Sequence, residues 1–173
     1  MGGSSGINFM LYTRGNKYDY DQWESLGNAG WAYKDLLKYF IKLENDTLHA
    51  GNKLRGKYGP IKVSHFPFRS SIGKAFIESG KELGYENLDY NLDQQISMSR
   101  WQTNTYKGKR WSTNRGYLHP ARDRENLSIT RNSHVTKILI NPSTKKAYGV
   151  KFVKNKQEIT VTVKKEVILC WSY

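Results

Sequence analysis

The sequence predicts an α+β fold, with helices in the N-terminal half and an antiparallel β meander in the C-terminal third. Apolar residues recur at helical spacing in residues 19–45 and 70–83. After residue 127 they occur instead in short β-branched runs separated by turn residues. The 173 residues are 38% hydrophobic, which is enough for a packed core. No apolar run approaches the roughly 20 residues that a bilayer requires, so no membrane span is expected.

Residues 19–45 are expected to form two helices. Tyr20 and Trp23 lie three residues apart on one helix face. The turn-forming residues 27–30 then interrupt the pattern. The second helix shows an apolar face made of Leu36, Leu37, Phe40 and Ile41.

The region that follows predicts a loop, a short strand and a third helix. Residues 49–60 are rich in glycine and basic side chains and read as a loop, and residues 61–63 alternate like a strand. The helix is expected to begin at Ser70 or Ser71, which can cap its first turn, and to end near Gly84.

Residues 87–110 show little periodicity and many polar side chains. Such a stretch is not expected to be buried on two faces, so we predict irregular structure. Met98 and Trp101 are the expected local anchors.

The last third of the chain contains short runs that are predicted as strands. In one of them, Ile159, Val161 and Val163 alternate with threonines, which indicates a sheet with one solvent-exposed face. The final run reads as a buried strand, although only Trp171, Ser172 and Tyr173 follow it. We therefore expect truncation at this end, and also at the abrupt glycine-rich start. The predicted strands are 127–130, 134–140, 148–153, 159–163 and 167–170.

The chain is strongly basic, with 28 Lys and Arg against 15 Asp and Glu and a net charge of +13. This excess suggests an anionic partner, and basic residues that flank aromatic ones could bind a nucleic-acid strand. No recognised nucleic-acid module accompanies them, which favours solvated loops instead. The two clusters are Lys53, Arg55 and Lys57 with Tyr58, and Lys107, Lys109 and Arg110 with Tyr106 and Trp111.

The N-terminal residues Gly2-Gly3-Ser4-Ser5 could alone be an anion-binding turn or a flexible terminus. They are followed at fixed spacing by Asn8-Phe9-Met10-Leu11-Tyr12-Thr13-Arg14-Gly15 and by Asp19-Tyr20-Asp21. In this order the segment resembles the first signature of the glucose–methanol–choline (GMC) flavin oxidoreductases, which include glucose dehydrogenase-like and choline dehydrogenase-like enzymes. Residues 108–113, 147–150 and 165–169 extend the resemblance along nearly the whole chain.

The resemblance implies a fragment of an α/β FAD-binding domain, with FAD as the cofactor. Residues 1–60 would be part of that domain, residues 61–110 the start of the substrate domain, and residues 111–173 the return to the FAD-binding domain. The glycines would permit close approach of the flavin, residues 8–11 would contact the isoalloxazine, and Val135 would contact the adenine through its backbone. From the residues alone, Val135 is a strand core residue. The implied cofactor-binding residues are Gly2, Gly3, Ser4, Asn8, Phe9, Met10, Leu11 and Val135.

Two parts of the family pattern are not found. The phosphate-binding Gly-x-Gly-x-x-Gly is absent from the sequence and is expected upstream of Met1. The family's catalytic histidine belongs to a more C-terminal region, so no catalytic residue is assigned in this chain and the FAD site is expected to be incomplete. The spacing of His and Cys predicts no metal site, and Cys170 is expected to be a small buried residue. A loop or surface role is expected for His49, His65, His119 and His134.

The function implied by the resemblance is oxidation of an alcohol or sugar, with hydride transfer to the flavin. The partners would be a small-molecule substrate and an electron acceptor, either a quinone or oxygen. The fragment alone is expected to be inactive. The alternatives are a basic nucleic-acid-binding module and a non-functional remnant of a truncated gene model. The sequence does not indicate a compartment, although enzymes of this family are often secreted.

Overall fold

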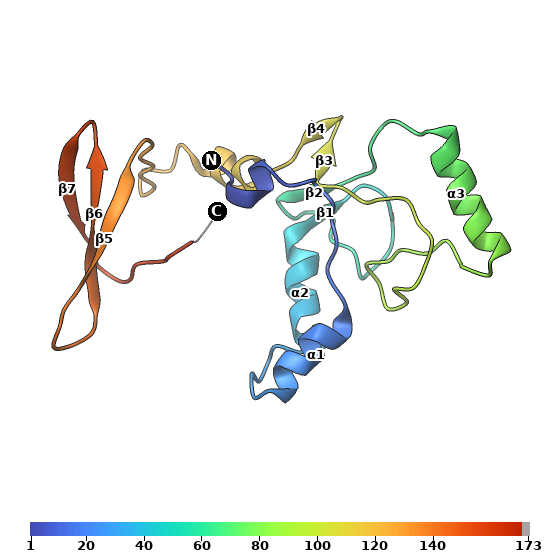
Figure 1. Ribbon diagram of the computed structural model, residues 1–173, viewed down its shortest axis with the longest axis horizontal. Helices are drawn as coiled ribbons and strands as arrows, with labels where there is room; N and C mark the ends of the chain where they lie inside the picture. The colour runs from blue at the N-terminus through green and yellow to red at the C-terminus, as the bar shows by residue number, and fades with distance from the viewer. Residues whose placement is uncertain (171–173) are drawn as a thin grey trace. The chain divides into compact units, whose positions relative to one another are not determined.

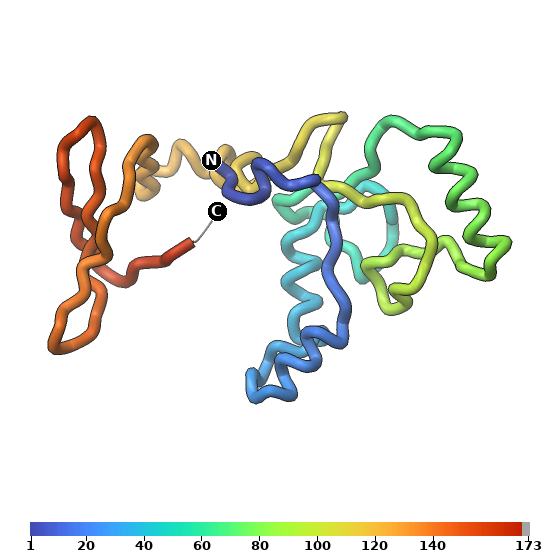
Figure 2. Tube along the Cα trace, in the orientation of Figure 1, coloured from blue at the N-terminus to red at the C-terminus, as the bar shows by residue number. Residues whose placement is uncertain are grey.

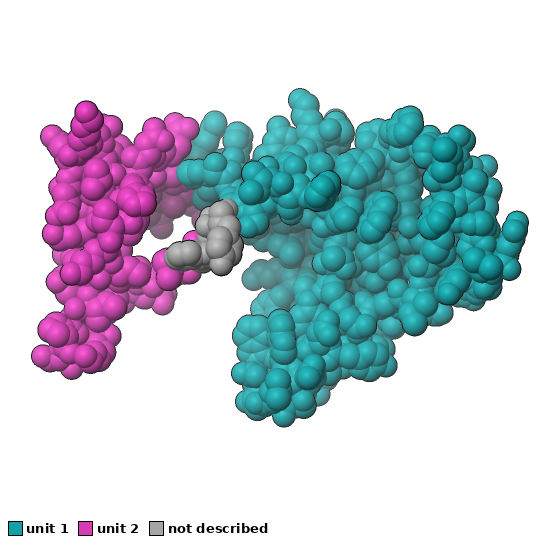
Figure 3. Space-filling view, viewed as in Figure 1, with its two compact units in different colours: residues 1–122 teal, residues 123–173 magenta. Residues whose placement is uncertain are grey.

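The computed structural model describes residues 1–170 and divides into two compact units, Met1–Arg122 and Asp123–Tyr173 (Figure 3). Each unit is considered by itself. The division of the chain into residues 1–60, 61–110 and 111–173 concerns function and stays a prediction. Among the described residues, no helix is both long enough and apolar enough to cross a bilayer.

The two predicted helices form in the first unit, after the N-terminal segment, and Figure 1 shows them meeting at an angle. The side chain of Asn16 caps the first helix by accepting a hydrogen bond from the backbone N–H of Tyr18 at 2.9 Å. The backbone N–H of Tyr33 donates to Asp21 Oδ1 at 3.0 Å and ties the second helix to the first. An edge-on contact of Tyr20 with Phe40 joins the two helices, and Tyr20 makes a second edge-on contact with Trp23 of its own helix. The helices are α1 (Lys17–Ser25) and α2 (Tyr33–Leu43).

A short parallel strand pair follows directly on α2 and lies at the centre of the unit. Strand β1 (Glu44–Asp46) pairs with β2 (Ile61–Val63), with Glu44 opposite Ile61. The predicted loop and strand are therefore confirmed. Val63 is fully buried and Ile61 is nearly so, which makes β2 the apolar core of the unit.

Helix α3 (Ser71–Glu82) begins and ends as predicted. The hydroxyl oxygen of Ser70 accepts a hydrogen bond from the N–H of Gly73, and Gly84 takes a φ of 85° just after the helix. Its apolar residues Ile72 and Phe76 are 80% and 66% exposed, so residues 1–170 leave most of this helix face uncovered.

Residues 87–110 are mostly irregular, as predicted, but the expectation that they are not deeply buried is wrong. Asn91 and Thr103 are completely buried, because the chain here runs between the N-terminal segment and β2, and Thr103 bridges both. Met98 packs against Gly80 as an anchor, whereas Trp101 is 62% exposed and does not. A two-residue hairpin closes the stretch, with β3 (Thr105–Tyr106) antiparallel to β4 (Lys109–Arg110).

A short helical region, η2 (Asn114–Leu118) followed by α4 (His119–Ala121), completes the first unit. Gly116 lies so close to Pro60 that a Cβ would be 2.7 Å from the Pro60 carbonyl oxygen. This close approach packs the helical turn directly against the chain that enters β2. Figure 2 follows the same path along the Cα trace.

The second unit is a three-stranded antiparallel meander in the order β5-β6-β7, which confirms the sheet type. Val150 pairs with Val161 and Phe152 with Ile159, so apolar side chains share one face. Lys151 and Glu158 form an ion pair of 2.6 Å. The strands are β5 (His134–Ile140), β6 (Ala147–Lys154) and β7 (Gln157–Thr162).

Two of the five predicted strands do not form. Residues 127–130 and 167–170 have no strand partner among residues 1–170, and an unpaired β run leaves its backbone groups to water. Ile168 is 75% exposed and Cys170 is also exposed, so the expectations of a buried final strand and a buried cysteine are wrong. The residues after Cys170 lie outside the described part of the chain.

Candidate functional site

The predicted flavin-contact segment, residues 2–11, begins with a tight 3₁₀ turn, η1 (Gly3–Gly6). Gly2 and Gly3 have φ values of 121° and 52°, which favour glycine. The carbonyl oxygen of Ser4 accepts hydrogen bonds from the N–H groups of Ile7 and Asn8, at 3.2 and 2.9 Å. These bonds hold the chain in a compact hook before it becomes extended.

A second segment, residues 110–113, holds this hook from one side. The Ser5 hydroxyl accepts a hydrogen bond from the N–H of Thr113 at 3.0 Å, and the Thr113 hydroxyl donates to the Gly2 carbonyl oxygen at 3.1 Å. Ser5 is therefore half-buried and used inside the protein, whereas the neighbouring Ser4 is exposed. The predicted Ser4 is the serine that remains available to a ligand.

The side chain of Asn8 joins its own segment to Arg110. Its Oδ1 accepts from the N–H of Met10 at 3.0 Å and from Arg110 Nη1 at 2.8 Å. Met10 takes a φ of 62°, and its carbonyl oxygen accepts from the N–H of Asn104 at 2.7 Å. Leu11 then bridges Thr103, so the segment passes directly into the core of the unit.

The segment also has exposed apolar side chains. Phe9 is 89% exposed, Ile7 is 79% exposed and Leu11 is 41% exposed. A Cβ placed on Gly6 would have no heavy atom within 4 Å, and Gly6 has no left-handed φ that would require glycine. Neither packing nor backbone conformation within residues 1–170 requires a glycine here, which leaves room for the close approach of a flat ligand. The residues present fit a flavin on this face.

Behind the segment lies a buried network of charged and polar side chains. Arg14 Nη2 contacts Glu44 Oε2 and Arg55 Nη1 contacts Glu44 Oε1, both at 2.5 Å, and the side chains of Arg14 and Glu44 are fully buried. Arg55 Nε also contacts Asp89 Oδ2 at 2.8 Å. Asn91 and Gln102 complete the network, with the N–H of Arg14 donating to Asn91 Oδ1 and Asn91 Nδ2 donating to Gln102 Oε1.

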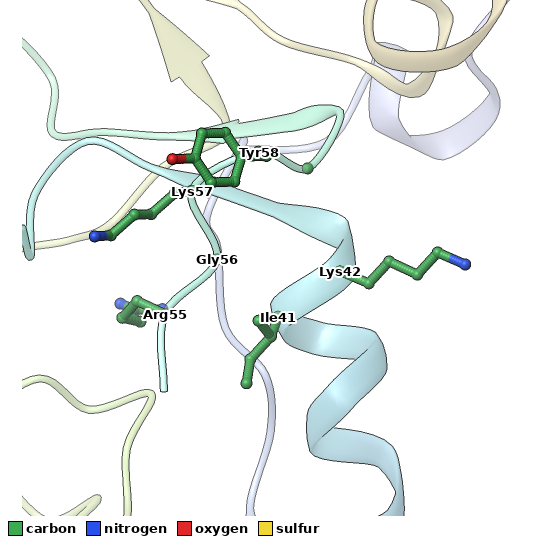
Figure 4. A pocket seen from close by; sticks show the side chains of 7 residues that line it. Ile41, Lys42, Arg55, Gly56, Lys57 and Tyr58 are labelled. Carbon is green, nitrogen blue, oxygen red and sulfur yellow. The ribbon is translucent and has the colours of Figure 1, made fainter. Parts of the chain in front are cut away.

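The interpretation of Lys53, Arg55, Lys57 and Tyr58 as a solvated loop is wrong for Arg55, which belongs to this buried network. Arg55 is 3% exposed, and each nitrogen of its guanidinium group donates to Glu44, Asp89 or Gln102. Lys57 is exposed and Tyr58 is 95% exposed, as a solvated loop requires. An open hollow of about 430 Å³ lies beside them (Figure 4). Because the Arg55 donors are already used, we assign no ligand to this hollow.

The four histidines have different environments, and two of them, His49 and His65, are half-buried. His49 Nδ1 lies 2.9 Å from Asp46 Oδ2, at the edge of the buried network. His65 Nδ1 lies 2.8 Å from the Trp101 carbonyl oxygen, and burial lowers the pKa of His65. His119 and His134 are exposed. Val135, the predicted adenine contact, is 55% exposed on the edge strand β5 rather than in a strand core.

Tyr12 connects the flavin-contact segment to the buried network, and its pKa is strongly raised. Burial raises the pKa of Tyr12 to about 12, and the Glu44 carboxylate adds to this shift. Because the folded state holds the phenol proton more tightly than the unfolded chain, this contribution to stability is complete below pH 10. It is lost as the pH rises from 10 to 12, by about 2–3 kcal/mol.

We therefore expect the Tyr12→Phe variant to lose less stability than the wild type between pH 10 and 12. The measurement is the urea midpoint of the full-length protein at each pH, compared between the two proteins. Burial also raises the pKa of Tyr90, so the difference between the proteins, not the wild-type loss itself, isolates Tyr12. Tyr58→Phe, at a fully solvated ring, is the matched control and should behave like the wild type. Equal losses in all three proteins would contradict the assignment.

A unit of mixed helices and strands with such a segment is the kind of structure expected of a flavin-dependent oxidoreductase. Comparisons with known proteins point to the same class. The family model described as GMC oxidoreductase matches residues 1–173, and the chain belongs to this family. It is 40% identical over 173 residues to "Glucose dehydrogenase [FAD, quinone]" of Drosophila melanogaster, covering 98% of this chain and 28% of the relative. It is 39% identical over 171 residues to "Oxygen-dependent choline dehydrogenase" of Sinorhizobium medicae, covering 98% of this chain and 30% of the relative.

Solved structures show the same fold. Pyridoxine 4-oxidase from Mesorbium loti superposes with a TM-score of 0.82 at 28% identity, over 92% of this chain and 31% of that protein. An FAD-dependent oxidoreductase from Chaetomium thermophilum superposes with a TM-score of 0.85 at 27% identity, over 95% of this chain and 31% of that protein. The predicted resemblance to a flavin-dependent family is thus confirmed. The chain spans less than a third of the length of each of these proteins.

The sequence selects residues 2–11 as the expected flavin-contact segment but not the residues that support it. Arg110 was grouped with a basic surface cluster, although its guanidinium group contacts the segment. Ser5 was not selected at all, and its contact with Thr113 joins residues 108 positions apart. The only signal in the sequence was that Arg110 and Thr113 both lie in residues 108–113, one of the matches to the GMC pattern.

Proposed function

We propose that this chain forms the flavin-contact part of an FAD-dependent oxidoreductase that oxidises an alcohol or a sugar. The observation that carries the proposal is the open, glycine-containing and apolar face of residues 2–11 in a member of the GMC family. The names of the relatives, a glucose dehydrogenase and a choline dehydrogenase, support a substrate with a CH–OH group. The electron acceptor would be a quinone or oxygen.

In this proposal the residues of the segment bind and orient the cofactor. Gly2, Gly3 and Ser4 would lie along the flavin, and Asn8 to Leu11 would contact the isoalloxazine ring. The exposed side chains of Phe9 and Leu11 would exclude water from the ring. Val135 would contact the adenine through the backbone of an edge strand. When bound, the flavin supplies the redox chemistry by accepting the hydride from the substrate carbon.

We assign no proton acceptor to the four histidines of this chain. The ring of His49 is engaged with Asp46 and that of His65 with a backbone carbonyl oxygen. Because the chain spans 28% of the length of glucose dehydrogenase, we propose that the catalytic base lies in another part of the full-length protein. We accordingly expect no turnover from residues 1–173 alone.

The nucleic-acid alternative is not supported by the comparisons, and the structure weakens its basis. Of the basic residues that suggested it, Arg55 is buried in ion pairs and Arg110 is bonded to Ser5 and Asn8. These two side chains serve internal contacts instead of a strand of phosphates. The remnant alternative is tested by the activity of the full-length protein.

The proposal is tested by purifying the full-length protein and recording its visible spectrum, followed by reduction of a dye with glucose, choline and simple alcohols. Bound FAD with its yellow absorbance, together with dye reduction by at least one alcohol or sugar, is the expected result. A protein that is folded but binds no FAD under reconstitution would contradict the proposal.

Gly6 offers a direct test of the open face. Gly6→Leu adds a side chain where no atom of residues 1–170 lies within 4 Å of the new Cβ, so the fold has room for it. We expect an unchanged melting temperature but FAD binding weaker by about tenfold or more, since the side chain occupies the space of the ligand. The measurement is equilibrium titration of the apoprotein with FAD, followed by flavin fluorescence.

The matched control is Ser25→Leu, which adds the same side chain at the exposed end of α1 (Figure 1). It should bind FAD like the wild type. An equal loss of FAD affinity in both variants would point to a general surface effect and would count against the proposed face.

A further inference from the structure

Arg110 makes two contacts with the flavin-contact segment through one nitrogen atom. Its Nη1 donates to the Ser5 carbonyl oxygen at 3.1 Å and to Asn8 Oδ1 at 2.8 Å. Arg110 belongs to β4, whose partner strand β3 is continuous with the residues that bond Met10 and Leu11. The β3–β4 hairpin therefore holds the guanidinium group of Arg110 against the flavin-contact segment.

These contacts determine which way the Asn8 carboxamide points. An amide oxygen has two lone pairs, and Oδ1 uses them for the N–H of Met10 and for Arg110. Both partners are donors, so the oxygen must occupy this side and the Nδ2 group the other. Asn8 is an exposed residue, and residues 1–170 place no hydrogen-bond acceptor on its Nδ2. The two N–H groups of Nδ2 therefore remain available as donors to a ligand.

We propose that Arg110 is a positioning residue for the cofactor, which fixes the Asn8 carboxamide so that Nδ2 donates to an acceptor atom of the flavin ring. This inference rests on the proposed function. The isoalloxazine ring carries carbonyl oxygens and ring nitrogens at its edge, which suit an N–H donor. Without Arg110 the orientation of the carboxamide depends on the N–H of Met10 alone, so the Nδ2 donor is held less firmly.

The test compares FAD affinity among variants of the full-length apoprotein, measured by fluorescence titration. We expect Arg110→Met to bind FAD about tenfold more weakly or worse, because a hydrogen bond with a charged donor is lost along with the fixed orientation. Arg110→Lys keeps a cationic donor and should recover part of that loss. Arg115→Met is the matched control, since Arg115 carries the same charge five residues further along, in η2, but is exposed and packs on Trp111. It should bind FAD like the wild type.

Asn8→Asp separates positioning from folding. The carboxylate keeps the acceptor for Met10 and Arg110 but removes the Nδ2 donor, so the melting temperature should be retained while FAD affinity falls about tenfold. In the double variant Arg110→Met with Asn8→Ala, the loss of FAD affinity should be clearly smaller than the sum of the two single losses, because Arg110 acts in part through Asn8. Its contact with the Ser5 carbonyl oxygen is the part that does not depend on Asn8.

Wild-type FAD affinity in Arg110→Met, or in folded Asn8→Asp, would overturn the inference. So would losses that add in the double variant, and a loss in Arg115→Met equal to that in Arg110→Met. These outcomes leave the proposed function standing, because the wild type still binds FAD. A wild type that binds no FAD would instead overturn the proposed function and the inference with it.

Discussion

Replacing Arg55 with methionine is expected to lower the free energy of unfolding by about 3–5 kcal/mol. The guanidinium group contacts Glu44 at 2.5 Å and Asp89 at 2.8 Å, and the side chains of both acids are at most 5% exposed. Methionine fills much of the same volume but leaves these carboxylates with fewer partners in a region from which water is excluded. A buried charge that loses its partner costs far more than an exposed one.

The change is measured as the urea dependence of unfolding of the full-length protein, with the slope compared between variants. Lys57→Met removes the same charge two residues away at an exposed position and should shift the free energy by no more than about 0.5 kcal/mol. Combining Arg55→Met with Glu44→Gln should cost less than the sum of the two single variants, since the ion pair between Arg55 and Glu44 is already lost in either single variant. A loss in Arg55→Met no greater than in Lys57→Met would contradict the role of the network.

The elements that the sequence predicted well are those with local causes. Helices α1, α2 and α3 each follow from apolar spacing and a capping or turn residue within the segment itself, as Asn16 and Ser70 show. The strands of the meander follow from alternation and nearby turns. Residues 167–170 have the same β-branched composition but no pairing strand among residues 1–170, and composition does not reveal a missing partner.

The polar core could not be predicted, because its causes are not local. Arg55 lies in a glycine-rich loop and resembles the solvated Lys57 in every feature of the sequence. Its burial depends on Glu44 and Asp89, the latter 34 positions away. Asn91 and Thr103 likewise look like loop residues until the chain is placed between the N-terminal segment and β2.

The candidate site divides in the same way. Residues 2–11 could be selected because their order resembles a family signature, and the structure shows an open face where that signature predicts a flavin. Arg110 and Thr113 support this segment from more than 100 positions away, and such contacts leave no periodic or compositional trace. The residues expected to contact the flavin are therefore easier to predict from sequence than the residues that hold their segment in place.

Gly59→Ala is expected to destabilise the protein by about 3 kcal/mol or more. A Cβ at this position would lie 2.3 Å from the carbonyl carbon and oxygen of Leu43 and 2.4 Å from the amide nitrogen of Glu44. All three are backbone atoms at the junction of α2 and β1, so no side chain can rotate away. The N–H of Gly59 also donates to the Glu44 carbonyl oxygen at 2.8 Å, and relieving the clash would break this bond. Since Gly59 has no left-handed φ, the cost arises from close approach and not from backbone strain.

Gly6→Ala is the matched control for this effect, because the same methyl group there meets no atom within 4 Å. It should leave the free energy of unfolding within about 0.5 kcal/mol of the wild type. Both variants are compared by urea unfolding of the full-length protein. If Gly59→Ala unfolds at the same urea concentration as Gly6→Ala, the contact between residue 59 and the end of α2 is not the one described. A large difference instead locates the steric requirement at Gly59, where the loop packs against the backbone of Leu43 and Glu44. Glu44 is also the first residue of β1 and a partner of Arg55, so the same close approach supports both the strand pair and the buried ion pairs.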